Sequence, residues 1–200
     1  QFKKFKKFFS KKIKTIDCTF NIEKSLKERI ESIREEAETA VREGSTCLVL
    51  SDKNISNQKA SIPSILHVGA VHSHLVKHGL RGYCSLNVES SDAMDTHSFA
   101  ILIGVGATTV NPYLAIDSIY QRFEKKLFGK SDFETCINKF KKSIDAGLLK
   151  IMSKMGISVI SSYRGGCNFE AVGLSRAIVS DYFPGMSSRI SGIGIIGIEK

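Results

Sequence analysis

The sequence predicts an α/β fold with a mainly parallel sheet and flanking helices, as in an incomplete (β/α) barrel. Short, almost wholly apolar runs alternate with longer stretches in which apolar residues recur every three or four positions. This alternation of strands and helices is typical of parallel sheets. A whole barrel usually needs about 250 residues, so a chain of 200 residues would hold only part of one.

The first elements form a helix, strand, loop, helix unit. Apolar residues at steps of three and four, with charge on the opposite face, predict an amphipathic helix over Ile22–Glu43. Gly44 stands where a C′ glycine ends a helix, and the apolar run Thr46–Leu50 then predicts a buried strand. Residues 53–61 are polar and loop-like, and Ser64–Lys77 is predicted to be the next helix.

The same pattern continues to the end of the chain. The remaining predicted elements are a strand over 83–88, a helix over 93–103, a strand over 108–111, helices over 114–127 and 133–155, a strand over 157–161, and short helices over 168–173 and 175–182. The long helix over 133–155 contains Gly147, where a break is expected. The glycine-rich segment Gly185–Gly197 has little charge, and we expect it to pack against a following domain.

The charge is concentrated at the start of the chain. The formal net charge is +9, and residues 1–14 hold seven Lys interleaved with Phe and no acidic residue. Such a segment could attract an anionic membrane or a phosphate backbone. A single basic run without a recognition fold is weak support for either, so we expect neither a nucleic-acid nor a membrane partner. We treat 1–14 as a basic lead-in and 15–200 as one domain.

Other sequence features exclude further classes of protein. The most apolar stretch, Phe99–Ala107, is far shorter than the roughly 18 to 20 residues of a spanning helix. The five cysteines form no CxxC pair or other ligand motif and are widely spaced. Free buried thiols in a reducing compartment, the cytoplasm or the plastid stroma, are the simplest interpretation.

Four of the five histidines, His67, His72, His74 and His78, crowd one predicted helix. The last two have the i, i+4 spacing that can bring two imidazoles to one metal ion. No HExxH glutamate accompanies them, so further ligands would have to come from elsewhere. Packing or hydrogen-bonded histidines are the favoured interpretation. His97 stands apart and has no evident catalytic partner.

Two glycine turns could hold a phosphate. In Gly104–Gly106, Thr109 replaces the third glycine of the dinucleotide-binding motif, so a tight helix-to-strand turn is favoured. Arg164–Gly166 follows a predicted strand, where backbone amides can attract an anion. A turn with a structural arginine is the favoured alternative.

Three carboxylates follow predicted strands, where α/β enzymes often place functional groups: Asp52, Glu89 and Asp92. Helix capping and solvation of loops explain them equally well. No serine-hydrolase, P-loop or cysteine-nucleophile motif appears. The residues themselves therefore predict an α/β domain with no catalytic, cofactor-binding or metal-binding residue.

Several segments, read as strings, resemble one family. They are EEAETAVREGSTCLVLSDKN, IPSILHVGAVHSHLVKHGLRGYCSLNVES, HSFAILIGVGATTVNPYLAIDSI and GLLKIMSKMGISVISSYRGGCNFEAVGLS. From about Lys14 to Gly194 they are similar, in order, to the central domain of the large (alpha) subunit of glutamate synthase. The combination of KIMSKMGIS with SYRGG and FEAVGL is highly specific.

This resemblance implies a part of an enzyme that makes glutamate from glutamine and 2-oxoglutarate. In that family a glutaminase domain releases ammonia, and an FMN domain with an iron–sulfur cluster uses it. The central domain joins the two, runs up to the start of the FMN domain and helps wall the ammonia tunnel. The resemblance transfers no catalytic residue and no cofactor to this segment. It implies the glutaminase and FMN domains of the same polypeptide as partners, and an electron-donating small subunit or ferredoxin. The alternative is a free-standing phosphate- or flavin-binding enzyme that uses the Arg164–Gly166 turn.

Overall fold

We analysed a computed structural model of the chain, which describes Lys4, Phe8 and residues 12–200. Most of the predicted basic lead-in lies outside these described residues. Its last residues, Ile13 and Lys14, are described and begin the first strand, β1 (Ile13–Asp17).

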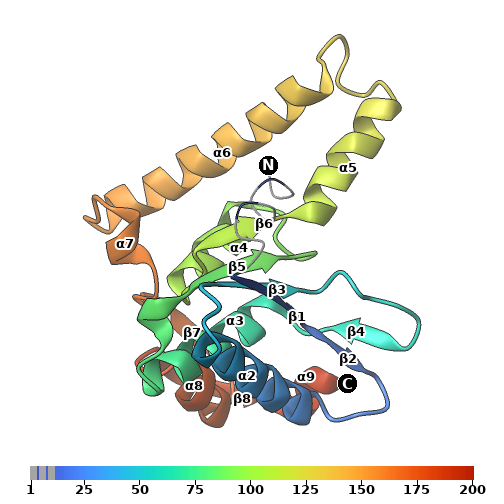
Figure 1. The fold of residues 1–200 in the computed structure, drawn as a ribbon. Helices are drawn as coiled ribbons and strands as arrows, with labels where there is room; N and C mark the ends of the chain where they lie inside the picture. The colour runs from blue at the N-terminus through green and yellow to red at the C-terminus, as the bar shows by residue number, and fades with distance from the viewer. Residues whose placement is uncertain (1–3, 5–7, 9–11) are drawn as a thin grey trace.

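An open parallel sheet forms the centre of the fold (Figure 1). Its four strands run in the order β1-β3-β5-β6, and each neighbouring pair is parallel. The three strands that join β1 are β3 (Cys47–Ser51), β5 (Ser85–Glu89) and β6 (Thr109–Asn111). The predicted α/β class with a parallel sheet is confirmed, and within the described residues the sheet does not close into a barrel.

Helices cover one face of this sheet and bury the apolar half of each strand. The covering helices are α2 (Leu26–Arg42), α3 (Ser64–Lys77) and α4 (Thr96–Gly104). Leu48, Leu50, Leu86 and Val88 are fully buried in the main core. Because side chains alternate along a strand, the residues between them point to the other face of the sheet, which is polar on β5 and β6.

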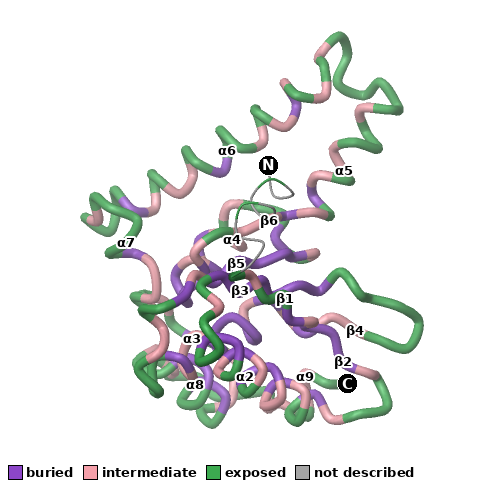
Figure 2. The backbone as a smooth tube through the Cα atoms, viewed as in Figure 1, coloured by how far each residue is buried: buried purple, intermediate pink, exposed green. Residues whose placement is uncertain are grey.

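A helical hairpin projects from the sheet as an arm (Figure 1). It consists of α5 (Tyr113–Glu124) and α6 (Phe133–Lys154), and most of its backbone is exposed or half-buried (Figure 2). The expected break near Gly147 is wrong, because α6 is continuous there. A side chain at this position would overlap with Thr96, so the glycine lets α6 approach the start of α4.

Two predictions in the C-terminal part of the chain are wrong. The predicted strand 157–161 is instead a turn followed by the short helix α7 (Ile160–Tyr163). The predicted helix 168–173 is instead the strand β7 (Glu170–Leu174), which pairs in parallel with β8 (Ser187–Ile193). Local β-branched content favoured a strand at 157–161, but no partner strand pairs with it among the described residues. The partner of β7 lies in the glycine-rich segment instead.

The rest of the C-terminal segment packs against the helices that cover the sheet. Helix α8 (Arg176–Tyr182) lies against α3, and the short helix α9 (Ile195–Glu199) lies against α2. Together with the β7–β8 pair they close the lower side of the core (Figure 1).

Several elements were not predicted. Among them are the edge strand β1 and the C-terminal elements β8 and α9, whose bounds are given above. The strands β2 (Thr19–Asn21) and β4 (Lys59–Ser61) form a small antiparallel pair, and β4 lies within residues 53–61, which were expected to be a loop. A single turn of 3-10 helix, η1 (Arg81–Tyr83), occupies the start of the predicted strand 83–88. Among the described residues, no helix is both long enough and apolar enough to cross a membrane.

Candidate functional site

Several buried polar side chains lie at the carboxyl ends of β3 and β5. Asp52 directly follows β3 and is fully buried. Its Oδ2 atom accepts hydrogen bonds from the Ser91 amide at 2.9 Å, the Ser91 hydroxyl at 2.6 Å and the Ser61 hydroxyl at 3.3 Å. Its Oδ1 atom is buried and has no hydrogen-bond partner among the described residues. The carboxylate therefore joins the β5–α4 loop to the end of β4.

Asp92 caps the beginning of α3 from a neighbouring loop. Its Oδ2 atom accepts a hydrogen bond from the Ser64 amide at 2.9 Å, and this amide is one of the donors that a helix start leaves without an internal partner. The Ser64 hydroxyl donates to the Ser90 hydroxyl at 2.9 Å, and Ser90 in turn donates to Asp92. Capping thus accounts for Asp92, which was one of the three carboxylates singled out in the sequence.

Glu89 is a buried carboxylate at the end of β5 that pairs with the partly exposed Lys53. Its side chain is only 3% exposed, and its Oε1 atom accepts from the Lys53 ammonium at 2.8 Å and from the Asn111 amide at 3.4 Å. The Lys53 ammonium also lies 5.0 Å above the ring of Tyr113. Burial, followed by the nearby Asp52 carboxylate, raises the pKa of Tyr113 to about 12, which keeps the phenol protonated.

The polar face of the sheet continues along β5 and β6. The Asn87 amide nitrogen donates to the Leu48 carbonyl at 3.1 Å, and its oxygen accepts from the Thr109 hydroxyl at 2.8 Å. Asn87 is fully buried, so these bonds offset the cost of removing its amide from water. The hydrogen bonds of Asn87 thus join the three adjacent strands β3, β5 and β6 on the polar face of the sheet.

His67 is the buried histidine beneath this edge. It is fully buried, and neither ring nitrogen has a hydrogen-bond partner among the described residues. Burial lowers its pKa to about 4, although the carboxylates of Asp92 and Asp52 oppose this shift. The imidazole is therefore neutral near pH 7. It is a member of the core, in agreement with the packing interpretation of the histidines.

The polar side chains at the carboxyl ends of β3 and β5 stabilise the fold and are not arranged for catalysis. Each of the three predicted carboxylates, Asp52, Glu89 and Asp92, is occupied by a hydroxyl, an amide or an ammonium. A general base or nucleophile pair would need a side chain aimed at a place that a substrate can reach. The structure does bring the three carboxylates to one edge, as the sequence suggested, but it uses them to hold loops and a helix start.

The backbone amides of the Arg164–Gly166 turn already donate hydrogen bonds to backbone carbonyls. The amide of Gly165 donates to the Ile103 carbonyl at 3.2 Å, and the amide of Cys167 donates to the Gly104 carbonyl at 3.1 Å. The Gly166 amide donates within the turn to the Tyr163 carbonyl. An anion loop needs such amides free to point at the ligand. The turn therefore does not fit the phosphate of FMN.

The Gly104–Gly106 turn is a tight helix-to-strand connection, which is the interpretation that the sequence favoured. Gly106 has a φ of +122° and joins the end of α4 to β6. Its carbonyl accepts from Arg81 Nη2 at 2.8 Å, and Arg81 Nε donates to His72 Nδ1 at 3.0 Å. Burial and then the Arg81 charge lower the pKa of His72 to about 4. This histidine is therefore a neutral hydrogen-bond acceptor that packs between the two glycine turns.

The remaining two histidines of α3 meet a carboxylate that the sequence analysis missed. Glu38 of α2 places its Oε2 atom 2.7 Å from His74 Nε2 and 3.9 Å from His78 Nε2. These three residues are the only group of three His, Cys, Asp or Glu side chains in the described part of the chain that could share a metal ion. The described cysteines thus form no cluster site.

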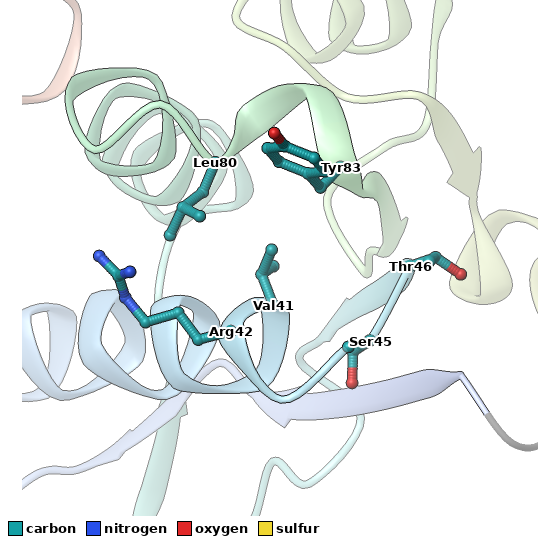
Figure 3. A pocket seen from close by; sticks show the side chains of 7 residues that line it. Val41, Arg42, Ser45, Thr46, Leu80 and Tyr83 are labelled. Atoms are coloured by element: carbon teal, nitrogen blue, oxygen red, sulfur yellow. The ribbon is translucent and has the colours of Figure 1, made fainter.

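A shallow hollow of about 420 Å³ lies at the end of α2 (Figure 3). It opens between the end of α2 and η1, and Figure 3 shows Val41, Leu80 and Tyr83 around it. The lining residues are Val41, Arg42, Gly44, Ser45, Thr46, Leu80 and Tyr83. None of them is a carboxylate, thiol or imidazole, so the hollow supplies no acid–base or nucleophilic pair.

Comparison with known proteins identifies the family. A family model described as the glutamate synthase central domain matches residues 1–175. The NADPH-dependent glutamate synthase large chain of Azospirillum brasilense is 55% identical over 188 residues, which cover 92% of this chain and 12% of that protein. The corresponding protein of Bacillus subtilis is 41% identical over 191 residues, covering 94% of this chain and 12% of the relative.

A relative with a different electron donor in its name matches over the same region. The ferredoxin-dependent glutamate synthase of Pyropia yezoensis is 42% identical over 199 residues, which cover 92% of this chain and 13% of that protein. The chain thus spans about an eighth of the length of these relatives. The match extends along nearly the whole chain, and the parallel sheet agrees with the expected α/β class. This chain belongs to the glutamate synthase central domain family.

Proposed function

We propose that this domain serves as a scaffold within a glutamate synthase, an oxidoreductase that converts glutamine and 2-oxoglutarate to glutamate. In this proposal it holds the glutaminase and FMN domains of the same polypeptide in place and helps wall the tunnel that carries ammonia between them. It has no reaction centre of its own. The family match over residues 1–175 carries the proposal, and the names of the relatives supply the activity.

The chemistry of the described cysteines supports the absence of a glutaminase centre. A thiol nucleophile works as a thiolate, which requires a lowered pKa. Burial raises the pKa of Cys18, Cys84 and Cys167. These thiols are therefore protonated near pH 7, and none is suited to attack the amide of glutamine.

The residues described here also do not fit the two cofactors of the proposed enzyme. The amides of the Arg164–Gly166 turn are occupied by carbonyls, and no three cysteines lie close enough to share a cluster. We therefore place FMN and the iron–sulfur cluster in neighbouring domains. The chain's own residues would act by position alone, through contacts that orient the two reaction centres.

The exposed apolar residues of the C-terminal unit are the proposed contact surface. Val172 of β7, Ile190 and Ile193 of β8 and Ile196 of α9 are between 46% and 70% exposed. Contiguous exposed apolar surface often marks an interface. Three of these residues, Ile190, Ile193 and Ile196, lie in Gly185–Gly197, the segment that was expected to meet a following domain. We assign this C-terminal apolar surface to contacts with the FMN domain.

The proposal includes an electron donor and a cellular compartment. Relatives are named for NADPH, NADH and ferredoxin, so either a small electron-donating subunit or ferredoxin would be the further partner. We place the protein in the cytoplasm or the plastid stroma, because its described cysteines are all free and a relative from Spinacia oleracea is named as chloroplastic. No nucleic-acid or membrane partner is included.

The absence of a reaction centre can be tested on the chain itself. We expect the purified 200-residue chain to carry no flavin absorption, to release no ammonia from glutamine, and to show no thermal shift with phosphate or FMN. Circular dichroism with the helix and strand content described above provides the folding control. One equivalent of bound FMN, or a shift that Arg164→Gln abolishes, would instead favour the free-standing phosphate- or flavin-binding enzyme.

A further inference from the structure

Glu38, His74 and His78 come from two helices and direct their polar atoms toward one another. Glu38 lies on α2, His74 lies on α3, and His78 is the residue that caps the end of α3; the two histidine rings are tilted, with centroids 4.2 Å apart. The ligand atoms of all three side chains lie within 4.8 Å of one another. The spacing of the histidines was evident in the sequence, but the third donor comes from the packing of α2 on α3.

Two of the three separations lie close to the spacing of donors around one metal ion, and the third, between the two imidazoles, is within 4.8 Å. Two donors bound to one tetrahedral Zn²⁺ at their usual distances lie roughly 3.3 Å apart. The Oε2 atom of Glu38 is 2.7 Å from Nε2 of His74 and 3.9 Å from Nε2 of His78. One separation would lengthen and the other would shorten by a similar small amount. Rotations of side chains that are partly exposed can supply such changes without moving either helix.

Hydrogen bonds around the group orient its donors. Nδ1 of His78 lies 2.8 Å from the His74 carbonyl, and because a carbonyl can only accept, Nδ1 carries the proton and leaves the Nε2 lone pair free. Histidine ligands of metals are commonly fixed in this way. Arg42 donates to the other carboxylate oxygen, Oε1 of Glu38, from Nε at 2.8 Å and Nη2 at 2.7 Å. Oε2 is thereby left facing the imidazoles.

We propose that Glu38, His74 and His78 form a binding site for a divalent transition-metal ion. Two imidazoles and one carboxylate favour Zn²⁺ and its neighbours Co²⁺, Ni²⁺ and Cu²⁺ over Mg²⁺ or Ca²⁺, which prefer oxygen ligands. Three protein ligands leave one tetrahedral position to solvent, and the side chain of His78 is 35% exposed. The ion would fasten α2 to α3, independently of the role proposed for the whole domain.

The test is a titration of the 200-residue chain with Zn²⁺ in competition with a chromophoric chelator, and with Co²⁺ followed by visible absorption. We expect one equivalent to bind, the Co²⁺ spectrum to be that of a four-coordinate nitrogen and oxygen site without thiolate bands, and the melting temperature to rise. His78→Gln should weaken binding by more than about tenfold, because it removes a direct ligand. Its side chain is on the surface, so the variant should fold.

His97→Gln is the matched control, since His97 is an exposed imidazole away from the group. It should bind Zn²⁺ as tightly as the unaltered chain. Glu38→Gln is a second variant and should also weaken binding, because an amide oxygen is a poorer ligand than a carboxylate. The proposal is wrong if no stoichiometric binding occurs, or if His78→Gln and His97→Gln change the affinity equally. Either result would leave Glu38 and His74 as an ordinary hydrogen-bonded pair.

Discussion

Gly106→Ala is expected to destabilise the fold by roughly 2 to 6 kcal/mol. The backbone at Gly106 has a φ of +122°, a conformation that residues with a side chain rarely adopt. A methyl group there would also overlap with the ring of His72. That ring accepts from Arg81, which itself donates to the Gly106 carbonyl, so the clash would disturb the whole connection between α4 and β6. Urea denaturation of the two proteins measures the difference.

Gly79→Ala is the matched control for this effect. Gly79 also has a positive φ, of +68°, but a side chain there would meet no atom within 4 Å. Only the backbone strain remains, and a loss of about 1 kcal/mol is expected. If both substitutions cost the same, the close packing of His72 on Gly106 contributes nothing, and the description of this turn is wrong.

The stability of the fold is expected to fall as the pH is lowered, because His67 is buried in the neutral form. Its pKa is about 4 in the folded state, compared with 6.5 for an ordinary histidine. Between these two values the unfolded chain binds more protons than the folded chain, so the free energy of unfolding decreases as the pH falls. For His67 alone the loss amounts to about 2 kcal/mol between about pH 7 and pH 5. His72 shifts in the same direction.

His67→Leu should remove the His67 part of this dependence. Leucine has a similar volume and lacks the two ring nitrogens that have no hydrogen-bond partner among the described residues. We therefore expect the variant to lose about 2 kcal/mol less than the unaltered chain over the same range. Urea titrations at both pH values provide the measurement. An unchanged pH dependence in the variant would show that His67 is not held neutral in the folded protein.

Three of the four strands of the main sheet, β3, β5 and β6, could be predicted because their information is local, whereas the edge strand β1 was not predicted. Thr46–Leu50 is apolar throughout, and it became the central strand β3, buried along its whole length. The glycines that end α2 and α3 likewise act within one turn of the chain. By contrast, β7 is a strand because β8 pairs with it, and β8 begins 17 residues after β7 begins. Residues 157–161 show the converse case, in which a strand-like composition found no strand to pair with.

The candidate site could be predicted only in part. Asp52, Glu89 and Asp92 were recognised because parallel strands end at a common edge, and the structure does bring them there. Their roles as partners of Ser91, Lys53 and a helix start depend on loops whose paths local sequence does not specify. Glu38 was missed for the same reason. Its nearest sequence signal is the i, i+4 pairing with Arg42, which says nothing about the helix that packs beside it.

In the proposed function this domain acts through position, by holding two reaction centres around an internal path for ammonia. A chimaera in which this chain replaces the matching segment of the Azospirillum brasilense large chain, 55% identical to it, tests that claim. Retained FMN and retained activity of each half-reaction, measured separately, show that the chimaera is folded.

The measurement is the amount of glutamine consumed per 2-oxoglutarate consumed. We expect a ratio near one for the chimaera, because ammonia that stays inside the protein is consumed by the half-reaction that uses 2-oxoglutarate. We expect a higher ratio when Ile190→Lys and Ile193→Lys charge the C-terminal apolar surface, because a displaced domain would let ammonia escape. A ratio well above one in the unaltered chimaera, with both half-reactions active, would contradict the proposed role.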